Sequence, residues 1–566
     1  MKIVIVGGVA GGATAATRLR RLDEKTDITV YERSGFISYA NCGLPYYIGG
    51  VIEDEEELTL QSPGSFWNRF RIKVNVRHDV TSINADRKTV TVHNLETDDI
   101  FEDTYDKLIL SPGAKPVMPN LTGIDSDKVF TLRTVEDTLK IHRFVETTKP
   151  RTAVMVGGGF IGLEMAENLS ELGIKVTVEQ RGNQLMNTLD YDMAAIIHSK
   201  LRSKGLNLKL NGDVTGFEEK DDGVSVLLQN DAPIKTDMVI LAIGVAPDNT
   251  LAKDANMELG IKGAIVVNDK METSISDIYA VGDAVQVKHT ITGNNAVISL
   301  AGPANKQGRI AADNICGYES RYKGSMGASV IKLFYLTAAS VGLTEKAAKD
   351  SGYNFESVIL SPSSHAGYYP GATTMTMKVV FDKSSLKILG AQIVGYDGVD
   401  KRIDVIATAI LAGLKATELK DLELAYAPPY SSAKDPVNMA GFIIDNIASG
   451  IVKQFHINEI DTLPKDGSVT LLDTRTEKEY ARGHVEGFIN IPVDSLRERL
   501  LEIDKTKPVY VMCQSGLRSY ISCRILTGVG FDCYNFAGGY RFYESVTNEK
   551  MQSAGSYPCG MDKQLR

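Results

Sequence analysis

Cysteine is scarce in this sequence: six residues among 566, at positions 42, 316, 513, 523, 533 and 559. Their spacing matches neither a disulfide framework nor a set of metal ligands. This scarcity excludes a disulfide-stapled secreted domain and a cysteine-based metal module. We therefore expect reduced thiols and a cytoplasmic location.

The sequence also lacks long apolar runs and an excess of positive charge. No run approaches the ~20 residues of a membrane-spanning helix, and Met1–Val6 leads straight into a glycine loop, so we expect no signal peptide. The net charge of -9 argues against nucleic acid as the main partner. With 43% hydrophobic and 23% charged residues, the chain is predicted to be globular, with roughly three or four domains.

A nucleotide-binding pattern fills the first thirty-odd residues. Lys2–Val6 is predicted to be a buried parallel strand, Gly7–Gly12 the turn before a helix, and Ile28–Tyr31 a second strand that ends at Glu32. Such glycines let backbone N–H groups approach a pyrophosphate at a helix N-terminus, and the acid can accept from ribose hydroxyls. Because Val9 replaces the middle glycine of the fingerprint, an ordinary βα turn stays an alternative.

A second copy begins at Arg151–Val156. Gly157–Gly162 matches the fingerprint fully, and the strand Val176–Val178 leads to Glu179. An acid at the end of that strand favours a free ribose 2′-hydroxyl, and so NADH over NADPH. Arg181, two residues later, keeps NADPH possible.

Three more segments accompany the two fingerprints: Tyr105–Ala114, Asp237–Pro247 and Thr273–Ala284, the last a strand that ends in Gly-Asp. In this order the five motifs resemble those of the two-dinucleotide-binding flavoprotein disulfide reductases, over about residues 1–450. The resemblance implies FAD on the first fingerprint and the nicotinamide cofactor on the second. The cofactor-binding residues that it implies are Gly7, Gly8, Gly11, Gly12, Glu32, Arg33, Val80, Ser111, Gly113, Arg133, Gly157, Gly159, Phe160, Ile161, Gly162, Glu179, Gly244, Gly282 and Asp283.

Cys42 lies in the segment Ser38–Pro45, directly after the first fingerprint. Ile37 and Tyr47 occupy the positions where a second cysteine would complete C-x-x-x-x-C, which rules out an internal disulfide here. Cys42 must therefore cycle through a mixed disulfide, a persulfide or a sulfenic acid, unless it is a buried inert cysteine. The segment resembles the S-F-x-x-C-x-x-P signature of coenzyme A disulfide reductases, with Tyr39 for phenylalanine. The resemblance implies a mixed disulfide with coenzyme A.

The phosphates of such a ligand need cations. Arg18, Arg20 and Arg21 on the first helix are candidates, although a solvated helix face is an equal alternative. The residues assigned to coenzyme A from the resemblance are Thr14, Arg18, Arg21, Ser38, Asn41, Arg69, Arg71, Asn305 and Lys434.

The region from Ser325 to about Ile447 is predicted to be α+β, and the alternation in Thr374–Phe381 predicts a strand. The family resemblance implies that it forms a homodimer interface. It also implies that Tyr368 and Tyr426 reach the other subunit's Cys42, where a phenol can donate to a leaving thiolate. Tyr369 and Tyr430 are the nearest alternative assignments.

A further α/β unit follows. Val469–Arg475 and Pro508–Met512 are predicted strands, and the second delivers the loop Cys513–Ser519. The order of motifs resembles a rhodanese domain over about residues 460–566. In such a loop backbone amides form an anion cradle around the Cys513 sulfur, and Arg518 adds positive charge. Cys523 is predicted to be core, and no role is assigned to Cys316, Cys533 or Cys559.

The predicted fold class is α/β, with two Rossmann-like dinucleotide-binding domains, an α+β dimerisation domain and a C-terminal α/β rhodanese domain. The predicted boundaries are 1–149 with 271–324 for FAD, 150–270 for NAD(P)H, 325–447 for dimerisation, 448–460 for a linker and 461–566 for rhodanese.

The whole chain resembles coenzyme A disulfide reductase–rhodanese fusions, including NADH-dependent persulfide reductases. The implied activity is NADH-driven reduction of coenzyme A persulfide, other persulfides or polysulfide through Cys42. Coenzyme A would be either a substrate or a bound thiol. A disulfide reductase with an accessory sulfurtransferase is the alternative. A peroxide or oxygen reductase is less favoured because Ala10 stands where those relatives place a histidine, and a sulfur-binding module without turnover does not need two dinucleotide sites.

Overall fold

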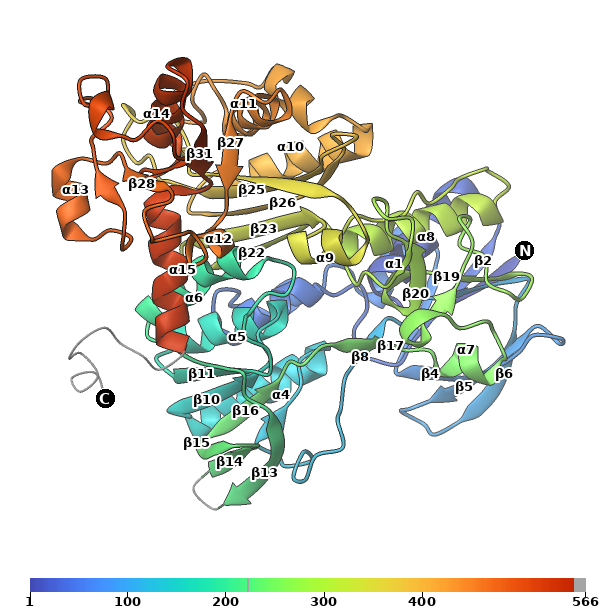
Figure 1. Cartoon of the computed structure of the whole chain (residues 1–566). Helices are drawn as coiled ribbons and strands as arrows, with labels where there is room; N and C mark the ends of the chain where they lie inside the picture. Colours follow the sequence, from blue (N-terminus) through green and yellow to red (C-terminus); the bar gives the residue numbers. More distant parts are fainter. Residues whose placement is uncertain (221–222, 554–566) are drawn as a thin grey trace. The chain divides into compact units, whose positions relative to one another are not determined.

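A computed structural model describes residues 1–220 and 223–553. Cys559, to which the sequence assigns no role, lies outside them. The chain divides into two compact units (Figure 1). The first unit comprises Met1–Leu185 and Gly205–Gly327, and the second comprises Met186–Lys204 and the described residues from Ala328 onward.

The first unit is built on two five-stranded parallel sheets. One has the order β19 (Ile278–Ala280), β7 (Lys107–Leu110), β1 (Lys2–Val6), β2 (Asp27–Glu32) and β3 (Lys73–Val76). The other has the order β12 (Asn207–Leu210), β11 (Lys175–Gln180), β10 (Thr152–Val156), β16 (Met238–Leu241) and β9 (Val129–Phe130). Each glycine fingerprint follows the central strand of its sheet, β1 or β10, as the sequence predicts.

The central strand of the first sheet is apolar because both of its faces are covered. Ile3 and Ile5 enter one buried cluster, together with residues of α1 (Ala10–Leu22) and α8 (Ala301–Ile315), and Val4 and Val6 enter another. This is the burial expected of a parallel strand.

The remaining strands of the first unit form small sheets. Two are antiparallel and three-stranded: β4 (His78–Asn84), β5 (Thr89–Asn94) and β6 (Ile100–Thr104), and β13 (Val214–Lys220), β14 (Gly223–Leu228) and β15 (Asp231–Thr236). The others are β8 (Ala114–Pro116) with β17 (Val245–Pro247), and β18 (Ile265–Val266) with β20 (Val285–Lys288) and β21 (Asn295–Ala296). The other α-helices are α2 (Leu44–Ile48), α3 (Pro63–Phe70), α4 (Val135–Thr148), α5 (Phe160–Glu171) and α7 (Thr250–Asp254).

The second unit contains an antiparallel sheet with the order β22 (Ser329–Leu333), β23 (Leu336–Gly342), β26 (Ile388–Gly395), β25 (Thr376–Asp382) and β24 (Phe355–Leu360). Its helices are α6 (Tyr191–Ser203), α9 (Glu345–Asp350), α10 (Val399–Ala412) and α11 (Pro436–Ala448). β25 confirms the predicted strand.

Helix α6 belongs to this second unit, although its sequence lies inside the segment predicted to bind NAD(P)H. A buried charge cluster explains the grouping. Lys378 of β25 is fully buried and donates to Asp192 of α6 at 2.7 Å, with Asp190 and Glu345 also within ion-pair distance. Asp190 and Asp192, at the start of α6, fasten this helix to the sheet through Lys378, and Glu345 adds a contact from α9. Periodicity along the chain does not reveal these contacts.

A five-stranded parallel sheet completes the second unit, with the order β27 (Lys453–Phe455), β31 (Cys533–Phe536), β30 (Val509–Met512), β28 (Thr470–Asp473) and β29 (Ile489–Asn490). Its helices are α12 (Ile457–Ile460), α13 (Glu477–Arg482), α14 (Leu517–Gly528) and α15 (Gly539–Ser553). Helix α15 lies beside α6 (Figure 1), and Arg202 forms an ion pair with the buried Glu549.

The predicted linker, residues 448–460, contains β27 and α12. β27 is an edge strand that pairs with β31 alone. Three residues on one edge are too few to produce a readable alternation, so this part of the sheet escaped the sequence analysis.

Candidate active site

The first glycine loop brings three backbone segments into close contact. A Cβ atom on Gly12 would lie 1.9 Å from the carbonyl oxygen of Gly7, and one on Gly7 would lie 2.1 Å from that of Ser111. Gly7 also has a φ of +91°, which only glycine adopts readily. No side chain caps α1, so its first N–H groups are free for an anion, as a pyrophosphate requires. The loop therefore fits FAD.

Glu32 stands at the carboxyl end of β2 and is almost fully buried. Its two carboxylate oxygens accept from the backbone N–H of Gly8 at 2.8 Å and of Ser34 at 3.0 Å. Burial raises the pKa of this carboxyl, and the two N–H groups act in the opposite direction. Each oxygen keeps a lone pair that ribose hydroxyls can use.

Arg133 and Asp283 form an ion pair at 2.8 Å. Asp283 follows β19, and Arg133 also donates to the carbonyl of Ala114 at 3.1 Å. Gly282, with φ +85°, donates its N–H to the buried Gln307 side chain at 2.7 Å. Gln307 was missed in the sequence because it lies on α8, outside the Gly-Asp motif.

The other residues assigned to FAD lie around these. Arg33 is exposed and pairs with Asp248 at 2.9 Å. Val80 is buried in β4, a Cβ on Gly11 would lie 2.9 Å from Val281, and Gly113 faces Arg133.

Cys42 is an exposed free cysteine in a single 3₁₀ turn, Asn41–Gly43, directly before α2. Although the residue is exposed, removal of water by the surrounding protein raises the pKa of its thiol. The Glu164 carboxylate raises this pKa further, while Arg133 lowers it and Asp283 raises it. The structure thus brings Cys42 into electrostatic reach of the Arg133–Asp283 pair.

Glu164 is a neighbour of Cys42 that the sequence analysis did not identify. It lies in α5, which packs against α2, the helix that follows Cys42. Burial raises the pKa of Glu164 to about 7, with a further contribution from Glu167. Glu164 belongs to the helix after the second fingerprint, and nothing in the sequence indicated that it would lie near Cys42, which follows the first fingerprint.

Packing of α1 against α8 assembles part of the predicted coenzyme A site. Thr14 donates its hydroxyl to Asn305 at 2.7 Å. Arg18 pairs with Asp313 at 2.7 Å, so part of its charge is already matched. Three residues predicted to contact the ligand therefore lie on one helix pair: Thr14, Arg18 and Asn305. Thr14 and Asn305 meet although 291 residues separate them in the sequence.

The expectation that Arg20 supplies a cation for phosphates is wrong. Arg20 is buried and donates to four backbone carbonyls, those of Phe70, Asp23, Glu24 and Arg71. These hydrogen bonds tie the end of α1 to neighbouring backbone and use the N–H donors of the guanidinium that a phosphate would need.

The remaining coenzyme A candidates differ in their exposure. Arg21, Arg69 and Lys434 are exposed, and Arg71 stacks over Trp67 at 5.5 Å. Ser38 has a φ of +51°, and the Oδ1 of Asn41 is buried without a hydrogen-bond partner. An orphaned acceptor beside Cys42 is the kind of group that a bound ligand satisfies.

The second glycine loop repeats the first. A Cβ on Gly162 would lie 2.0 Å from the carbonyl of Gly157, and one on Gly157 would lie 2.4 Å from that of Ala242. Gly159 precedes α5, whose first turn holds Phe160 and Ile161, and neither Gly159 nor Gly244 has a neighbouring atom within 4 Å of such a Cβ. An uncapped helix start with open space before it fits a dinucleotide.

Glu179, assigned to the ribose of that dinucleotide, is 2% exposed. Its Oε1 is buried without a hydrogen-bond partner and faces Gly212, where a Cβ would lie 2.5 Å away. Burial, followed by the charge of Asp213, raises the pKa of Glu179 to about 7. The neighbouring Gln180 accepts from the N–H of Gly158 at 2.8 Å.

Replacing Glu179 with glutamine is expected to stabilise the protein at pH 8 and not at pH 5. The folded-state pKa lies above the unfolded one, so the native carboxyl is protonated without cost below pH ~4.5, and stability is lost as the pH rises toward 7. Glutamine removes a cost of about 1–3 kcal/mol at pH 8. Thermal melting at both pH values measures this, and an equal shift at both would contradict a role for ionisation.

Tyr368 and Tyr426 are 58 residues apart in the chain and meet through their hydroxyls at 2.7 Å. Both rings are exposed, and the bond from Tyr368 raises the pKa of Tyr426. Tyr369 instead stacks edge-on against His365, and Tyr430 is exposed.

Arg402 holds the two tyrosine segments together, although the sequence analysis did not identify it. It is 1% exposed and donates to the carbonyls of Ser364 at 3.0 Å and Tyr430 at 3.2 Å. It also pairs with Asp435 at 3.0 Å. Burial tends to raise the pKa of Asp435, but its hydrogen bonds to Val437, Ser431 and Arg402 hold that pKa below its usual range.

Cys513 follows β30 and is fully buried. Its sulfur accepts from the N–H of Gly516 at 3.1 Å and from the hydroxyl of Ser519 at 3.2 Å. The predicted cradle of backbone amides around the sulfur is therefore formed in part by a side-chain hydroxyl, that of Ser519. The loop backbone is also held by Tyr540, which donates its N–H to the Cys513 carbonyl at 2.7 Å.

Arg518 does not act as an unpaired cation in this loop. Its guanidinium binds Glu479 through two hydrogen bonds of 2.8 and 2.7 Å, and this contact holds the pKa of Glu479 at about 2. Nearby, Asp473 and Arg475 form a second, buried pair at 2.7 Å, with Arg475 over the ring of Tyr540.

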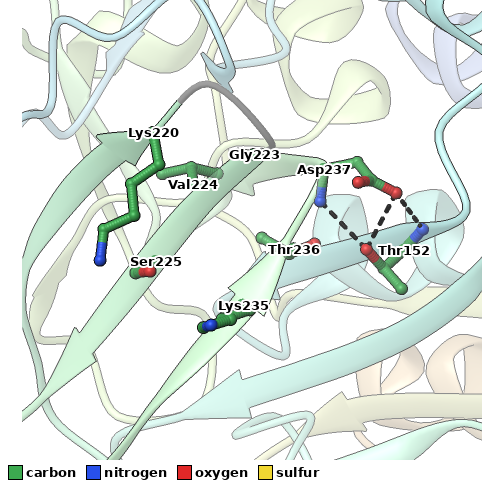
Figure 2. Close-up of a pocket in the computed structure, with 8 residues that line it drawn as sticks. All are labelled: Thr152, Lys220, Gly223, Val224, Ser225, Lys235, Thr236 and Asp237. Atoms are coloured by element: carbon green, nitrogen blue, oxygen red, sulfur yellow. Dashed lines mark hydrogen bonds between the residues drawn. The ribbon is translucent and has the colours of Figure 1, made fainter.

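A separate pocket lies at the end of the second parallel sheet where β10 begins, opposite the end that leads into the second glycine loop (Figure 2). Thr152, at the start of β10, donates its N–H and hydroxyl to Asp237 at 2.9 and 3.0 Å. Ligands of such sheets bind beyond the carboxyl ends of the strands. None of the residues predicted for catalysis or binding lines this pocket, which is formed by Thr152, Lys220, Gly223, Val224, Ser225, Lys235, Thr236 and Asp237.

Within the described ranges, 1–220 and 223–553, no helix has the length and apolar character needed to cross a membrane. The same residues contain no cluster of three or more histidine, cysteine or acidic side chains arranged to hold a metal ion.

Comparison with known proteins identifies three family matches. Residues 1–308 match the pyridine nucleotide-disulphide oxidoreductase family, 329–436 match the dimerisation domain of that family, and 457–545 match a rhodanese-like domain. The cofactors of this oxidoreductase family are FAD and NAD(P)H, as the sequence predicts.

Two solved structures span nearly the whole chain. Reduced CoADR-RHD from Bacillus anthracis is 48% identical, with a TM-score of 0.95 and coverage of 97% of this chain and 98% of its own. A NAD-dependent persulfide reductase from A. fulgidus is 36% identical, with a TM-score of 0.90 and coverage of 96% and 100%.

Coenzyme A disulfide reductase from Staphylococcus aureus strain JH9 is 39% identical over 442 residues, which is 78% of this chain and 99% of that protein. The predicted fold class is confirmed by these matches. The chain is an oxidoreductase with a rhodanese-like domain, and it belongs to the pyridine nucleotide-disulphide oxidoreductase family.

Proposed function

We propose that this enzyme uses NAD(P)H, through FAD, to reduce coenzyme A persulfide, other persulfides or polysulfide at Cys42. The observation that carries the proposal is the exposed Cys42 near the Arg133–Asp283 pair, in a chain that also holds the buried Cys513 in a rhodanese-like domain. A sulfur-carrying domain has no task in simple disulfide reduction. The persulfide reductase and CoADR-RHD relatives support this assignment.

The protein's part begins with holding its cofactors. When bound, FAD would supply the electron pair, drawn from NAD(P)H, that returns Cys42 to its thiolate. The free N–H groups at the starts of α1 and α5 would hold the two pyrophosphates, and Glu32 would accept from the flavin nucleotide's ribose. Asp283, held by Arg133, orients polar groups of the flavin cofactor.

At Cys42, the thiolate attacks the S–S bond of the persulfide R–S–SH. A new S–S bond forms to Cys42, the bond within the persulfide breaks, and sulfide or the thiol leaves with the bonding electrons. An electron pair then cleaves the bond to Cys42 and restores its thiolate. The sum is R–S–SH + NAD(P)H + H⁺ giving RSH + H₂S + NAD(P)⁺, with two electrons transferred.

Coenzyme A is proposed to bind, as substrate or as a held thiol, beside Cys42, with contacts from the α1–α8 pair and from Asn41. The dimerisation domain supports a homodimer in which Tyr368 and Tyr426, hydrogen-bonded to each other, donate to the partner's leaving thiolate. Cys513 accepts or delivers sulfane sulfur in the rhodanese domain. The domain boundaries given above, except for α6 and for β27 and α12 in residues 448–460, belong to this proposal, as does a cytoplasmic location.

A disulfide reductase with an accessory sulfurtransferase is the second candidate, and the Staphylococcus aureus relatives favour it. We expect the purified flavoprotein to reduce coenzyme A persulfide with a kcat/KM at least about tenfold above that for coenzyme A disulfide, a difference of about 1.4 kcal/mol. The two candidates are distinguished by the rate of NAD(P)H oxidation, measured side by side with coenzyme A persulfide, coenzyme A disulfide, polysulfide and hydrogen peroxide. Faster disulfide reduction would establish the second candidate, and turnover of peroxide alone would refute both.

A further inference from the structure

The two dinucleotide-binding segments share one backbone design, so their residues can be matched by equivalent contacts. In the first copy, the N–H of Gly7 donates to the carbonyl of Tyr31 at 2.8 Å. In the second, the N–H of Gly157 donates to the carbonyl of Glu179 at 2.8 Å. The strand registers agree, because Val6 pairs with Tyr31 and Val156 pairs with Glu179. Glu179 is therefore the counterpart of Tyr31.

The next residue in each copy faces the glycine loop. Gly8 donates its N–H to Oε2 of Glu32 at 2.8 Å, and Gly158 donates its N–H to Oε1 of Gln180 at 2.8 Å. Successive side chains of a strand point to opposite faces of its sheet, so only one of Glu179 and Gln180 can hold this position. Gln180 holds it.

A second contact supports the same register. Ile37 packs on Gly8, where a Cβ would lie 2.8 Å from it, and Leu185 packs on Gly158, where a Cβ would lie 2.2 Å from it. Ile37 comes five residues after Glu32, and Leu185 comes five residues after Gln180.

We propose that Gln180 and Arg181, rather than Glu179, recognise the adenosine ribose of the nicotinamide cofactor, and that the site accepts the 2′-phosphate of NADPH. The inference deepens the proposed function and rests on its placement of the nicotinamide cofactor on the second glycine loop. An acid at this strand end holds a ribose diol and repels a phosphate. The neutral Gln180 removes that repulsion, and because its oxygen faces Gly158, its amide N–H₂ is available as a donor.

Arg181 supplies the matching charge. It is exposed, and no carboxylate in the described part of the chain forms an ion pair with it. Its counterpart in the first copy, Arg33, is bound by Asp248 at 2.9 Å. An unpaired guanidinium next to a ribose site is a bidentate ligand for a phosphate group.

The acids around this strand end do not restore selection against phosphate. Glu179 lies on the other face of the sheet, buried beside Gly212, and burial raises its pKa to about 7, so near neutral pH part of it is uncharged. The exposed Asp213 raises the pKa of Glu179 and Lys209 lowers it, so the charges of these two neighbours of Glu179 act with opposite signs.

The test is binding of 2′,5′-ADP and 5′-AMP to the FAD-loaded enzyme, measured by isothermal titration calorimetry. We expect 2′,5′-ADP to bind more tightly than 5′-AMP. Gln180→Glu and Arg181→Ala should each weaken 2′,5′-ADP on the order of tenfold, as loss of a charge-assisted contact does, and change 5′-AMP much less. Glu179→Gln is the matched control and should leave the ratio of the two affinities unchanged. Flavin content and melting temperature show that each variant is folded.

Tighter binding of 5′-AMP by the unaltered enzyme, or an unchanged ratio in Gln180→Glu, would overturn the inference. A shift of the ratio by Glu179→Gln would return the role to Glu179 and also overturn it. If neither nucleotide binds, the assignment of the second loop fails with it. This measurement involves no sulfur substrate. Its outcome therefore does not depend on whether the enzyme reduces persulfides.

Discussion

Changing Cys42 to serine is expected to abolish NAD(P)H-driven reduction of every sulfur substrate, by at least about a thousandfold in kcat. A serine hydroxyl cannot form the S–S bond on which each proposed turnover depends. No second cysteine can replace it, because Ile37 and Tyr47 occupy the positions where a partner would stand. Flavin content should be unchanged, since Cys42 forms no part of the glycine loop or the Arg133–Asp283 pair.

Changing Cys513 to serine is expected to give the opposite pattern. Cys513 follows a strand of a separate parallel sheet and has its own contacts from Gly516 and Ser519, so we expect it to handle sulfur rather than electrons. Reduction of a small persulfide or disulfide should continue, while sulfur transfer from thiosulfate should disappear. NAD(P)H oxidation by both variants on a disulfide, a small persulfide and polysulfide provides the measurement. Equal failure of the two variants on all three substrates would show one obligatory relay instead.

Changing Arg402 to methionine is expected to destabilise the fold by about 3–5 kcal/mol, because removal of one partner leaves the buried charge of Asp435 uncompensated. It also removes the donors to Ser364 and Tyr430, which hold the two tyrosine segments. The hydrogen bond between Tyr368 and Tyr426 should loosen, and activity at permissive temperature should fall. Thermal melting followed by a rate measurement checks both effects.

Lys401 provides the matched control on the same helix. Its side chain is partly exposed, and its ammonium lies 3.9 Å from the buried Asp435, at the limit of an ion pair. A contact so long and so open to water on the lysine side is expected to contribute at most about 1 kcal/mol. Lys401→Met should therefore melt within a few degrees of the unaltered protein. If Arg402→Met behaves in the same way, the buried pair does not organise these loops.

The sequence alone determined the features that depend on short, continuous stretches of chain. Each glycine loop is read locally because strand, turn and helix follow one another directly, as in Lys2–Leu22. The lack of a second cysteine near Cys42 is likewise a fact of spacing, and so is the order of motifs that placed the chain in its family and fold class. The comparisons confirm that family and fold.

The tertiary structure decided which side chains meet and which way they face. Sequence spacing pointed to Glu179, but a shift of one residue along a strand changes the face of the sheet, and only the backbone contacts of Gly158 show that Gln180 faces the loop. Arg20, expected to meet a ligand, is instead enclosed by backbone carbonyls. Lys378 and Arg402 look like ordinary surface residues in sequence, yet both are buried. Their carboxylate partners lie far along the chain, and folding alone brings them within reach.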